Sequence, residues 1–239
     1  MIVHTEAVVL HSIRYGEADL IATLFTKESG LTSYLLRGVL KSKKGKLRSA
    51  LFLPLTVLDI EAVHKNKGTL ERIKEAKRKH SYANIHEDIV KRSLVFFLAE
   101  ILKNSIKEEE ANPELYEFME TTIAWLDAHQ DVANFHIVFM IKLTQYLGFY
   151  PDTSDMTHSY FNLQEGCFQH MKTNRYCIQG EKVEKLKIFL GTKFDDAMHV
   201  KLSKIVRTDI IDLLLVYFEL HLHEFKKPKS QAILNEIFS

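Results

Sequence analysis

The sequence predicts an α+β protein in which a five-stranded N-terminal barrel is followed by an all-helical region. Short runs rich in β-branched residues, separated by small turns, fill residues 1–80, whereas apolar residues recur at helical spacing from residue 81 onward. Charge divides at the same place, since residues 1–80 hold 15 Lys and Arg against 8 Asp and Glu, and the remainder holds 17 against 23. We therefore expect two domains, 1–80 and 81–239, the second with a small irregular insert at 150–180.

Five strands are expected in the first domain, at residues 2–13, 20–26, 31–36, 52–60 and 69–76. Gly30 suits the tight turn before the third strand, because glycine accepts a positive φ. Pro54 places the fourth strand at an edge, or marks its first residues. Closing five short strands into a barrel removes exposed strand edges. An oligonucleotide-binding (OB) barrel is the first candidate and an SH3-like barrel is the second.

Helices are expected at residues 85–106, 113–126, 132–147, 182–190, 202–225 and 230–237. Asn112 and Pro113 favour the start of the second helix, with Asn as the N-cap and Pro at the first helical position. Residues 150–180 lack helical periodicity, which predicts the irregular insert. The helices are expected to pack together as one bundle.

The stretch 34–48 predicts a polyanion-binding loop. No Asp or Glu occurs between Glu28 and Asp59. Each Lys or Arg that neutralises a phosphate releases a condensed counterion, so a cationic loop held between strands suits nucleic acid. A merely solvated loop is the alternative. The predicted DNA-binding residues here are Arg37, Lys41, Lys43, Lys44, Lys46 and Arg48, joined by Arg14 at the rim of the barrel.

Two further sets of residues can extend this interface. Tyr34 and Phe52 flank the basic loop and can stack on an unpaired base, although their strand spacing favours the barrel core. Lys201, Lys204 and Arg207 recur at intervals of three, which predicts a shared helix face and a second group of DNA-binding cations. A solvated helix face is the alternative for that group.

The sequence gives no support for catalysis or for membrane insertion. None of the nine glycines form a phosphate-binding motif, and no nucleophile elbow is present. No apolar segment approaches the length of a membrane span, about 20 residues, and the N-terminus does not resemble a signal peptide. Two cysteines make no disulfide framework. We expect a cytoplasmic, non-enzymatic protein.

A metal site in the insert is a weaker alternative. Cys167, His170 and Cys177, with His158 upstream, could supply four ligands, but their spacing is not that of paired zinc knuckles. Cysteine is also common as a small buried apolar residue. Neither reading is excluded by the spacing.

The order of short motifs resembles the bacterial recombination mediator family RecO along the whole chain. The N-terminal motifs are residues 7–10 (AVVL), 15–19 (YGEAD), 24–26 (LFT), Gly30 and 37–38 (RG). The later motifs are residues 147–151 (LGFYP), 217–222 (YFELHL), 229–230 (KS) and Leu234.

This resemblance implies an OB domain, a helical domain and a zinc-finger-like insert. It also implies a nucleoid-associated protein that binds single- and double-stranded DNA and anneals complementary strands. The implied partners are RecR, the acidic C-terminal tail of single-strand-binding protein and, indirectly, the recombinase RecA. Many members carry two cysteine pairs in the insert, whereas here the first pair is absent, so no zinc or other cofactor is expected. An RNA-binding OB module and a protein-interaction scaffold remain as alternatives.

Overall fold

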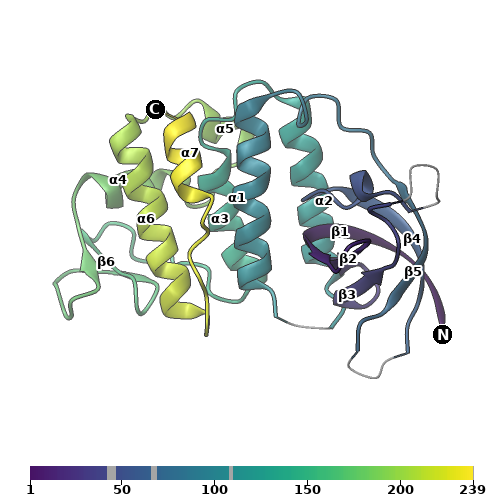
Figure 1. Cartoon of the computed structure of the whole chain (residues 1–239). Helices are drawn as coiled ribbons and strands as arrows, with labels where there is room; N and C mark the ends of the chain where they lie inside the picture. The colour runs from purple at the N-terminus through teal and green to yellow at the C-terminus, as the bar shows by residue number, and fades with distance from the viewer. Residues whose placement is uncertain (42–46, 66–68, 108–109, 239) are drawn as a thin grey trace. The chain divides into compact units, whose positions relative to one another are not determined.

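The computed structural model describes residues 1–41, 47–65, 69–107 and 110–238. The chain divides into two compact units, Met1–Ala128 and His129–Ser239. The first holds a five-stranded sheet and two helices, and the second holds further helices and a three-stranded sheet (Figure 1). This arrangement confirms the predicted α+β class. Because the first unit includes both of its helices, it does not isolate residues 1–80, and that domain boundary stays a prediction.

The five-stranded sheet closes on itself. Its antiparallel strands are β1 (Ile2–Tyr15), β2 (Asp19–Thr26), β3 (Gly30–Leu36), β4 (Val57–Val63) and β5 (Arg72–Arg78), in the order β3-β2-β1-β4-β5. Glu71, just before β5, forms two backbone hydrogen bonds with β3. The Leu35 amide donates to the Glu71 carbonyl, and the Glu71 amide donates to the Ser33 carbonyl, both at 2.9 Å. The two edge strands therefore meet, as the predicted OB barrel requires.

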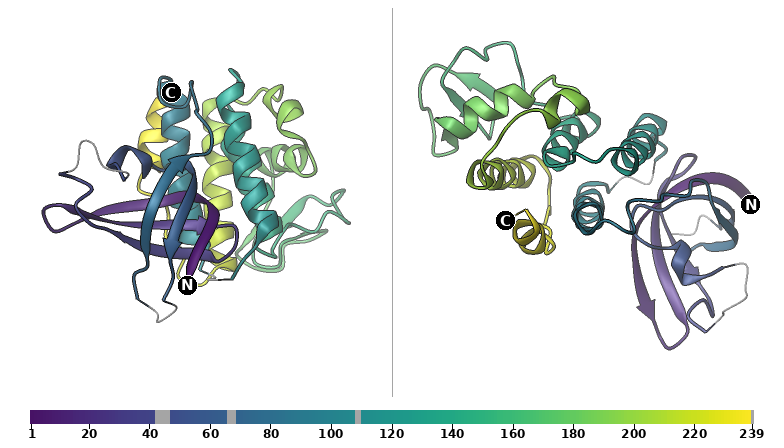
Figure 2. Two further views of the ribbon diagram at one scale, coloured as in Figure 1. Left: turned by 90° about the vertical axis from the view of Figure 1, so that its right-hand side faces the viewer. Right: turned by 90° about the horizontal axis from the view of Figure 1, so that it is seen from above.

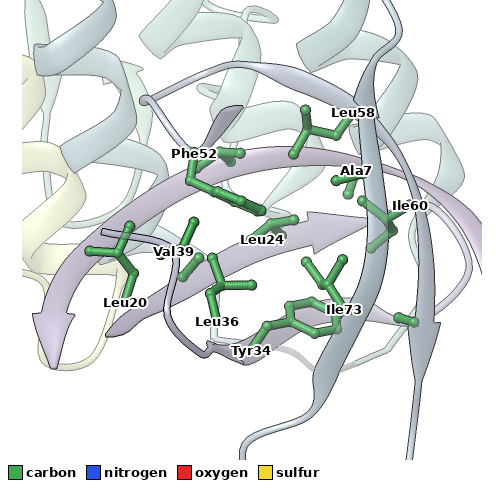
Figure 3. Close-up of a cluster of buried hydrophobic side chains, with 14 residues drawn as sticks. Ala7, Leu20, Leu24, Tyr34, Leu36, Val39, Phe52, Leu58, Ile60 and Ile73 are labelled. Atoms are coloured by element: carbon green, nitrogen blue, oxygen red, sulfur yellow. The ribbon is translucent and has the colours of Figure 1, made fainter. Parts of the chain in front are cut away.

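The core of the barrel follows from strand alternation. In β2, the side chains of Leu20, Ala22 and Leu24 point inward and are buried, while the residues between them are only partly covered. Tyr34 and Phe52 lie among them and are at most 1% exposed (Figure 3). β1 is long enough to pair with both β2 and β4, and its register shifts between Val9 and His11. Such an irregularity bends a strand, which helps a sheet to curl.

The fourth strand differs from the prediction. Residues 52–60 were expected to be extended, but β4 begins at Val57, after the 3-10 helix η1 (Ser49–Leu51) and a turn. Leu55 adopts a positive φ of 56°, and its amide donates to the carbonyl of Val9 at 2.7 Å. Phe52 and Leu55 are buried, so their apolar character serves the barrel core rather than a strand. Pro54 has no amide to offer a sheet, which agrees with the turn.

Two helices complete the first unit and contact β1 (Figure 2). They are α1 (Ile89–Ser105) and α2 (Pro113–Ala128). The Asp88 carboxylate caps α1 by accepting the amides of Val90 and Lys91 at 2.7 and 3.1 Å. Asn112 Oδ1 accepts the amide of Leu115 at 3.0 Å, which confirms the predicted cap of α2.

The second unit is mostly helical. Its helices are α3 (Phe135–Tyr146), α4 (Glu181–Phe189), α5 (Phe194–Met198), α6 (Lys204–His221) and α7 (Gln231–Ile237). The short α5 was not predicted, and α6 ends at His221 rather than at residue 225. The insert is more regular than predicted, because it holds β6 (Tyr160–Asn162), β7 (Cys167–Gln169) and β8 (Cys177–Ile178), in the order β7-β6-β8. No described helix has the length and apolarity to cross a bilayer.

Candidate nucleic-acid interface

Arg14 and Arg37 lie at the same end of the barrel. Arg14 pairs with Leu20 across β1 and β2, and Leu20 pairs with Leu36 across β2 and β3. Arg37 follows Leu36 directly, so the three strands present both arginines along one sheet end. Both side chains are exposed. The register of the sheet thus brings together two of the predicted DNA-binding residues.

The start of the basic loop is fixed to the neighbouring turn. Gly38 has a φ of +68°, and its amide donates to Asp19 Oδ1 at 2.7 Å. The amide of Leu40 donates to the carbonyl of Ala18 at 2.9 Å. Val39 is buried in the barrel core. These contacts hold the backbone next to Arg37 in place at this end of the barrel.

Lys41 is the one described loop lysine, and it is exposed. Its ammonium lies 3.3 Å from Glu17 Oε2, and the two side chains are 66% and 90% exposed. A pair this exposed contributes little to stability, because water screens it and holding two long side chains costs entropy. Lys41 therefore remains accessible to a phosphate that competes with Glu17.

Arg48 lies where the loop returns to the barrel. It is exposed and precedes η1, and among the described residues no carboxylate pairs with its side chain. Arg78 on β5 donates from Nη2 to the carbonyl of Ala50 at 3.2 Å, which adds an exposed cation beside η1. Ser12 on β1 donates to the carbonyl of Phe52 at 2.9 Å, so this segment is tied to the strand that leads to Arg14.

Arg78 was not predicted as a site residue. The only signal in the sequence was the alternation of polar and apolar residues along the strand 72–78, which places its polar side chains, including Arg78, on the outside of the barrel. Three predicted residues, Lys43, Lys44 and Lys46, lie outside the described part of the chain, so their predicted role stays a prediction.

The aromatic residues near the basic loop are either buried in the barrel core or exposed at its end. Tyr34 and Phe52 are buried in the core, which confirms that reading and leaves neither free to stack on a base. Tyr15, next to Arg14, is 54% exposed at the end of β1. Base–aromatic stacking is worth about 1–3 kcal/mol and tolerates any sequence. Tyr15 is therefore the described aromatic side chain best placed for that contact.

The second group of predicted cations does not form one helix face. Lys201 precedes the helix, because Ser203 is the N-cap of α6 and its hydroxyl accepts the amide of Val206 at 3.3 Å. Arg207 is only partly exposed, its Nε donates to Asn134 Oδ1 at 3.2 Å, and its guanidinium lies 5.7 Å from the ring centre of Phe238. The expected shared face is wrong, since a cap interrupts the spacing and internal contacts hold Arg207.

Lys204 is exposed at the first position of α6. A cation there opposes the helix macrodipole, so it does not serve the stability of the helix. Lys201 is exposed as well, and the DNA-binding role of these two lysines stays a prediction.

The candidate metal ligands of the insert are not gathered as one ligand set in the described residues. Cys167 and Cys177 sit on the two outer strands, each paired with Asn162 of the central strand. The Cys177 sulfur contacts Gln169 Nε2 at 3.0 Å and Thr173 Oγ1 at 3.4 Å. Within the described ranges, no group of three His, Cys, Asp or Glu side chains is arranged to hold a metal ion. Amide and hydroxyl groups thus surround the Cys177 sulfur, and the absence of zinc stays a prediction.

Comparison with known proteins accounts for the whole chain. Residues 1–82 match the family described as recombination protein O N terminal, and residues 86–231 match recombination protein O C terminal. The DNA repair protein RecO of Christiangramia forsetii is 45% identical over 238 residues, covering 100% of both chains. That of Flavobacterium psychrophilum is 43% identical and that of Phocaeicola vulgatus 30%, each again over 100% of both chains. The chain therefore belongs to the recombination protein O (RecO) family.

Proposed function

We propose that this protein works in DNA repair and recombination by binding DNA without reading its sequence. The observation that supports this most directly is the gathering of Arg14, Arg37, Lys41 and Arg48 at the barrel, all of them exposed. Contacts to phosphates position a protein on nucleic acid but carry no sequence information. The described cations would therefore hold single- and double-stranded DNA alike.

Annealing follows from the same contacts. Two complementary strands repel each other through their phosphates, and a surface that neutralises part of this charge lets them approach. We propose that the protein anneals complementary strands in this way. It would act without catalysing a covalent reaction, as a cytoplasmic, nucleoid-associated factor that requires no zinc or other cofactor.

The proposed partners are those that the family resemblance implies. They are RecR, the acidic C-terminal tail of single-strand-binding protein and, indirectly, RecA, which the protein would help to load. An acidic tail requires cations beside apolar surface. Lys204 and Arg207 adjoin Ile211, Leu234 and Phe238 around a small cavity of about 10 Å³, which supports this place in the second unit as the one that would take the tail.

The central experiment measures binding of the full chain to fluorescent dT oligonucleotides and to duplex DNA across a salt series. Reversing the charge of Arg37, Lys41 and Arg48 to Glu should weaken both at least about tenfold and reduce the salt slope by about 0.7 per lost contact on single strands. The matched control reverses three exposed cations on or just after α1, Arg92, Lys103 and Lys107, and should leave binding unchanged.

Charge reversal of Lys41, Lys43, Lys44 and Lys46 together should abolish binding. Equal affinity of the wild type and both loop variants would contradict the proposed interface. Competition with RNA of the same length tests the alternative of an RNA-binding module, and failure of the wild type to bind at low salt would favour a scaffold. Annealing of oligonucleotides coated with single-strand-binding protein, with and without the chain, tests the mediator role.

A further inference from the structure

A second cationic element lies in the insert, far along the chain from the barrel. The segment between β7 and β8, residues 170–176, is here named the insert loop. It carries His170, Lys172 and Arg175, all exposed, and no Asp or Glu occurs between Glu165 and Glu181. Within the described part of the chain, neither Lys172 nor Arg175 pairs with a carboxylate.

Hydrogen bonds from polar side chains hold the conformation of the insert loop. Gln169 Nε2 donates to the carbonyl of Met171 and to Thr173 Oγ1, both at 2.8 Å. Asn174 Oδ1 accepts the amide of Tyr176 at 2.8 Å. The loop is thus fixed on both sides of its cations. A preorganised loop loses less conformational entropy when it binds a ligand.

The Arg175 guanidinium and the Tyr176 ring lie against each other at the end of the loop, and the two are here named the Arg175–Tyr176 platform. The guanidinium lies 4.7 Å from the centre of the Tyr176 ring, and Nη2 donates to the Tyr176 hydroxyl at 2.7 Å. A guanidinium has five N–H donors, so the remaining donors can meet a phosphate. Unpaired bases stack on aromatic rings and on guanidinium planes, and this platform offers both.

The insert loop spans the length of the three-stranded sheet. Gln169, at the end of β7, pairs with Tyr160, whereas Cys167 and Cys177, at the starts of β7 and β8, both pair with Asn162. The loop therefore leaves one end of the sheet and returns at the other, where burial and the charges of Glu165, Asp152 and Asp155 raise the pKa of the Cys167 thiol. No Asp or Glu lies within the loop itself, so a polyanion would contact the loop residues.

We propose that the insert loop is a second contact for single-stranded nucleic acid, in which Lys172 and Arg175 meet phosphates and a base stacks on the Arg175–Tyr176 platform. An acidic peptide would need only the charges, whereas the exposed Arg175 guanidinium beside the partly exposed Tyr176 ring is suited to a base. This inference rests on the proposed function, since it assumes that the chain binds DNA, and it adds a site that the barrel does not contain.

Binding of the full chain to fluorescent dT oligonucleotides tests the site. The double variant K172E/R175E should bind about tenfold more weakly, with a salt slope smaller by about 1.4, the value for two lost phosphate contacts on a single strand. The control K193E/K229E makes the same charge change at two exposed lysines of the second unit and should bind like the wild type. Equal thermal midpoints show that all three proteins are folded.

Two single changes separate stacking from charge. Tyr176→Leu should weaken single-strand binding several-fold while leaving duplex binding unchanged, and Tyr176→Phe should retain most of the affinity, because the ring persists. Photo-crosslinking of the wild type to an oligonucleotide containing 5-iodouracil should label the tryptic peptide 176–182.

The outcomes distinguish failure of the insert-loop contact from failure of the proposed function. If the wild type binds no DNA, the proposed function itself fails. If the wild type binds DNA, K172E/R175E binds equally well and crosslinks fall only in residues 1–128, the insert loop is not a nucleic-acid contact. Loss of binding to an acidic peptide without loss of DNA binding would also overturn the proposal.

Discussion

The Tyr34 hydroxyl lies 2.9 Å from His64 Nε2 inside the barrel, where both residues are buried. Burial lowers the pKa of the His64 imidazole and raises that of the Tyr34 phenol, so both groups are neutral when they share this hydrogen bond. His64 also forms two backbone hydrogen bonds with Met1. The His64 amide donates to the Met1 carbonyl at 3.0 Å, and the N-terminal ammonium of Met1 donates to the His64 carbonyl at 2.8 Å. The pair therefore links β3 to the chain end that starts β1.

Replacing Tyr34 by Phe should destabilise the protein by about 1–2 kcal/mol. The ring stays in the core, but the His64 imidazole loses its partner in a buried site. Urea denaturation followed by circular dichroism measures the change. Tyr15→Phe removes the same hydroxyl at an exposed position and should leave the unfolding free energy unchanged, and an equal effect of both substitutions would contradict the assignment.

Tyr15→Ala should weaken binding of single-stranded DNA about tenfold, as expected for the loss of one stacked base. Duplex binding should change much less, because paired bases do not present their faces. Tyr15→Phe retains the ring and should bind like the wild type. Anisotropy titrations with dT and duplex oligonucleotides give the comparison, and equal loss on both substrates would show that Tyr15 acts through the fold instead.

The Asp127 carboxylate joins the end of α2 to the segment before α1. It accepts the backbone amides of Ala83, Asn84 and Ile85 at 3.2, 2.8 and 2.8 Å. The buried ammonium of Lys91 donates to the Asp127 carbonyl at 2.9 Å. Asp127→Ala should cost about 2–4 kcal/mol, because several amides lose their acceptor. Asp131→Ala removes an exposed carboxylate and should cost less than about 0.5 kcal/mol in the same denaturation experiment.

His136 makes stability depend on pH. Burial, with a smaller contribution from Arg207, lowers its pKa from 6.5 to about 3. The unfolded chain therefore binds a proton below pH 6.5 that the folded chain does not, and stability falls as the pH drops from 6.5 towards 3, by about 1.4 kcal/mol per pH unit for this group.

His136→Leu should reduce that slope by about one proton. His11 and His64, whose pKa values burial also lowers, maintain part of it. Urea midpoints at several pH values between 4 and 8 measure the slope. The exposed His86 offers the control, since His86→Gln should leave the slope as in the wild type.

The sequence predicted the parts of the fold that repeat a local pattern. Strand alternation located β1, β2 and β3 to within one or two residues, and Asn112 with Pro113 marked the start of α2. The prediction failed where an apolar run served a tertiary purpose. Phe52 and Leu55 are apolar because they fill the barrel core, and composition alone does not distinguish that role from a strand.

The sequence predicted which region holds the candidate site, but not which side chains lie close together there. The absence of acidic residues around the basic loop indicated Arg37 and Arg48, which the structure leaves exposed. Arg78 was missed because its relation to η1 depends on how β5 crosses the barrel. The surroundings of Arg207 were not predictable, since helical spacing cannot reveal that Asn134, 73 positions earlier, accepts its hydrogen bond, and its DNA-binding role stays a prediction.

The insert should keep its stability without a metal. Burial alone would raise the pKa of the Cys177 thiol, but hydrogen bonds with Thr173 and the Asn174 backbone outweigh it and lower the pKa. Because no three His, Cys, Asp or Glu side chains of the described insert are gathered as metal ligands, a chelator such as EDTA should leave the thermal midpoint unchanged and added zinc should not raise it, whereas a structural zinc site would respond to both. Cys177→Ala should cost about 1–3 kcal/mol, because Gln169 and Thr173 lose a buried partner. Cys167→Ala, at a less buried position outside this network, should cost less. A midpoint that falls on chelation would mean that metal, not this hydrogen-bonded network, holds the insert together.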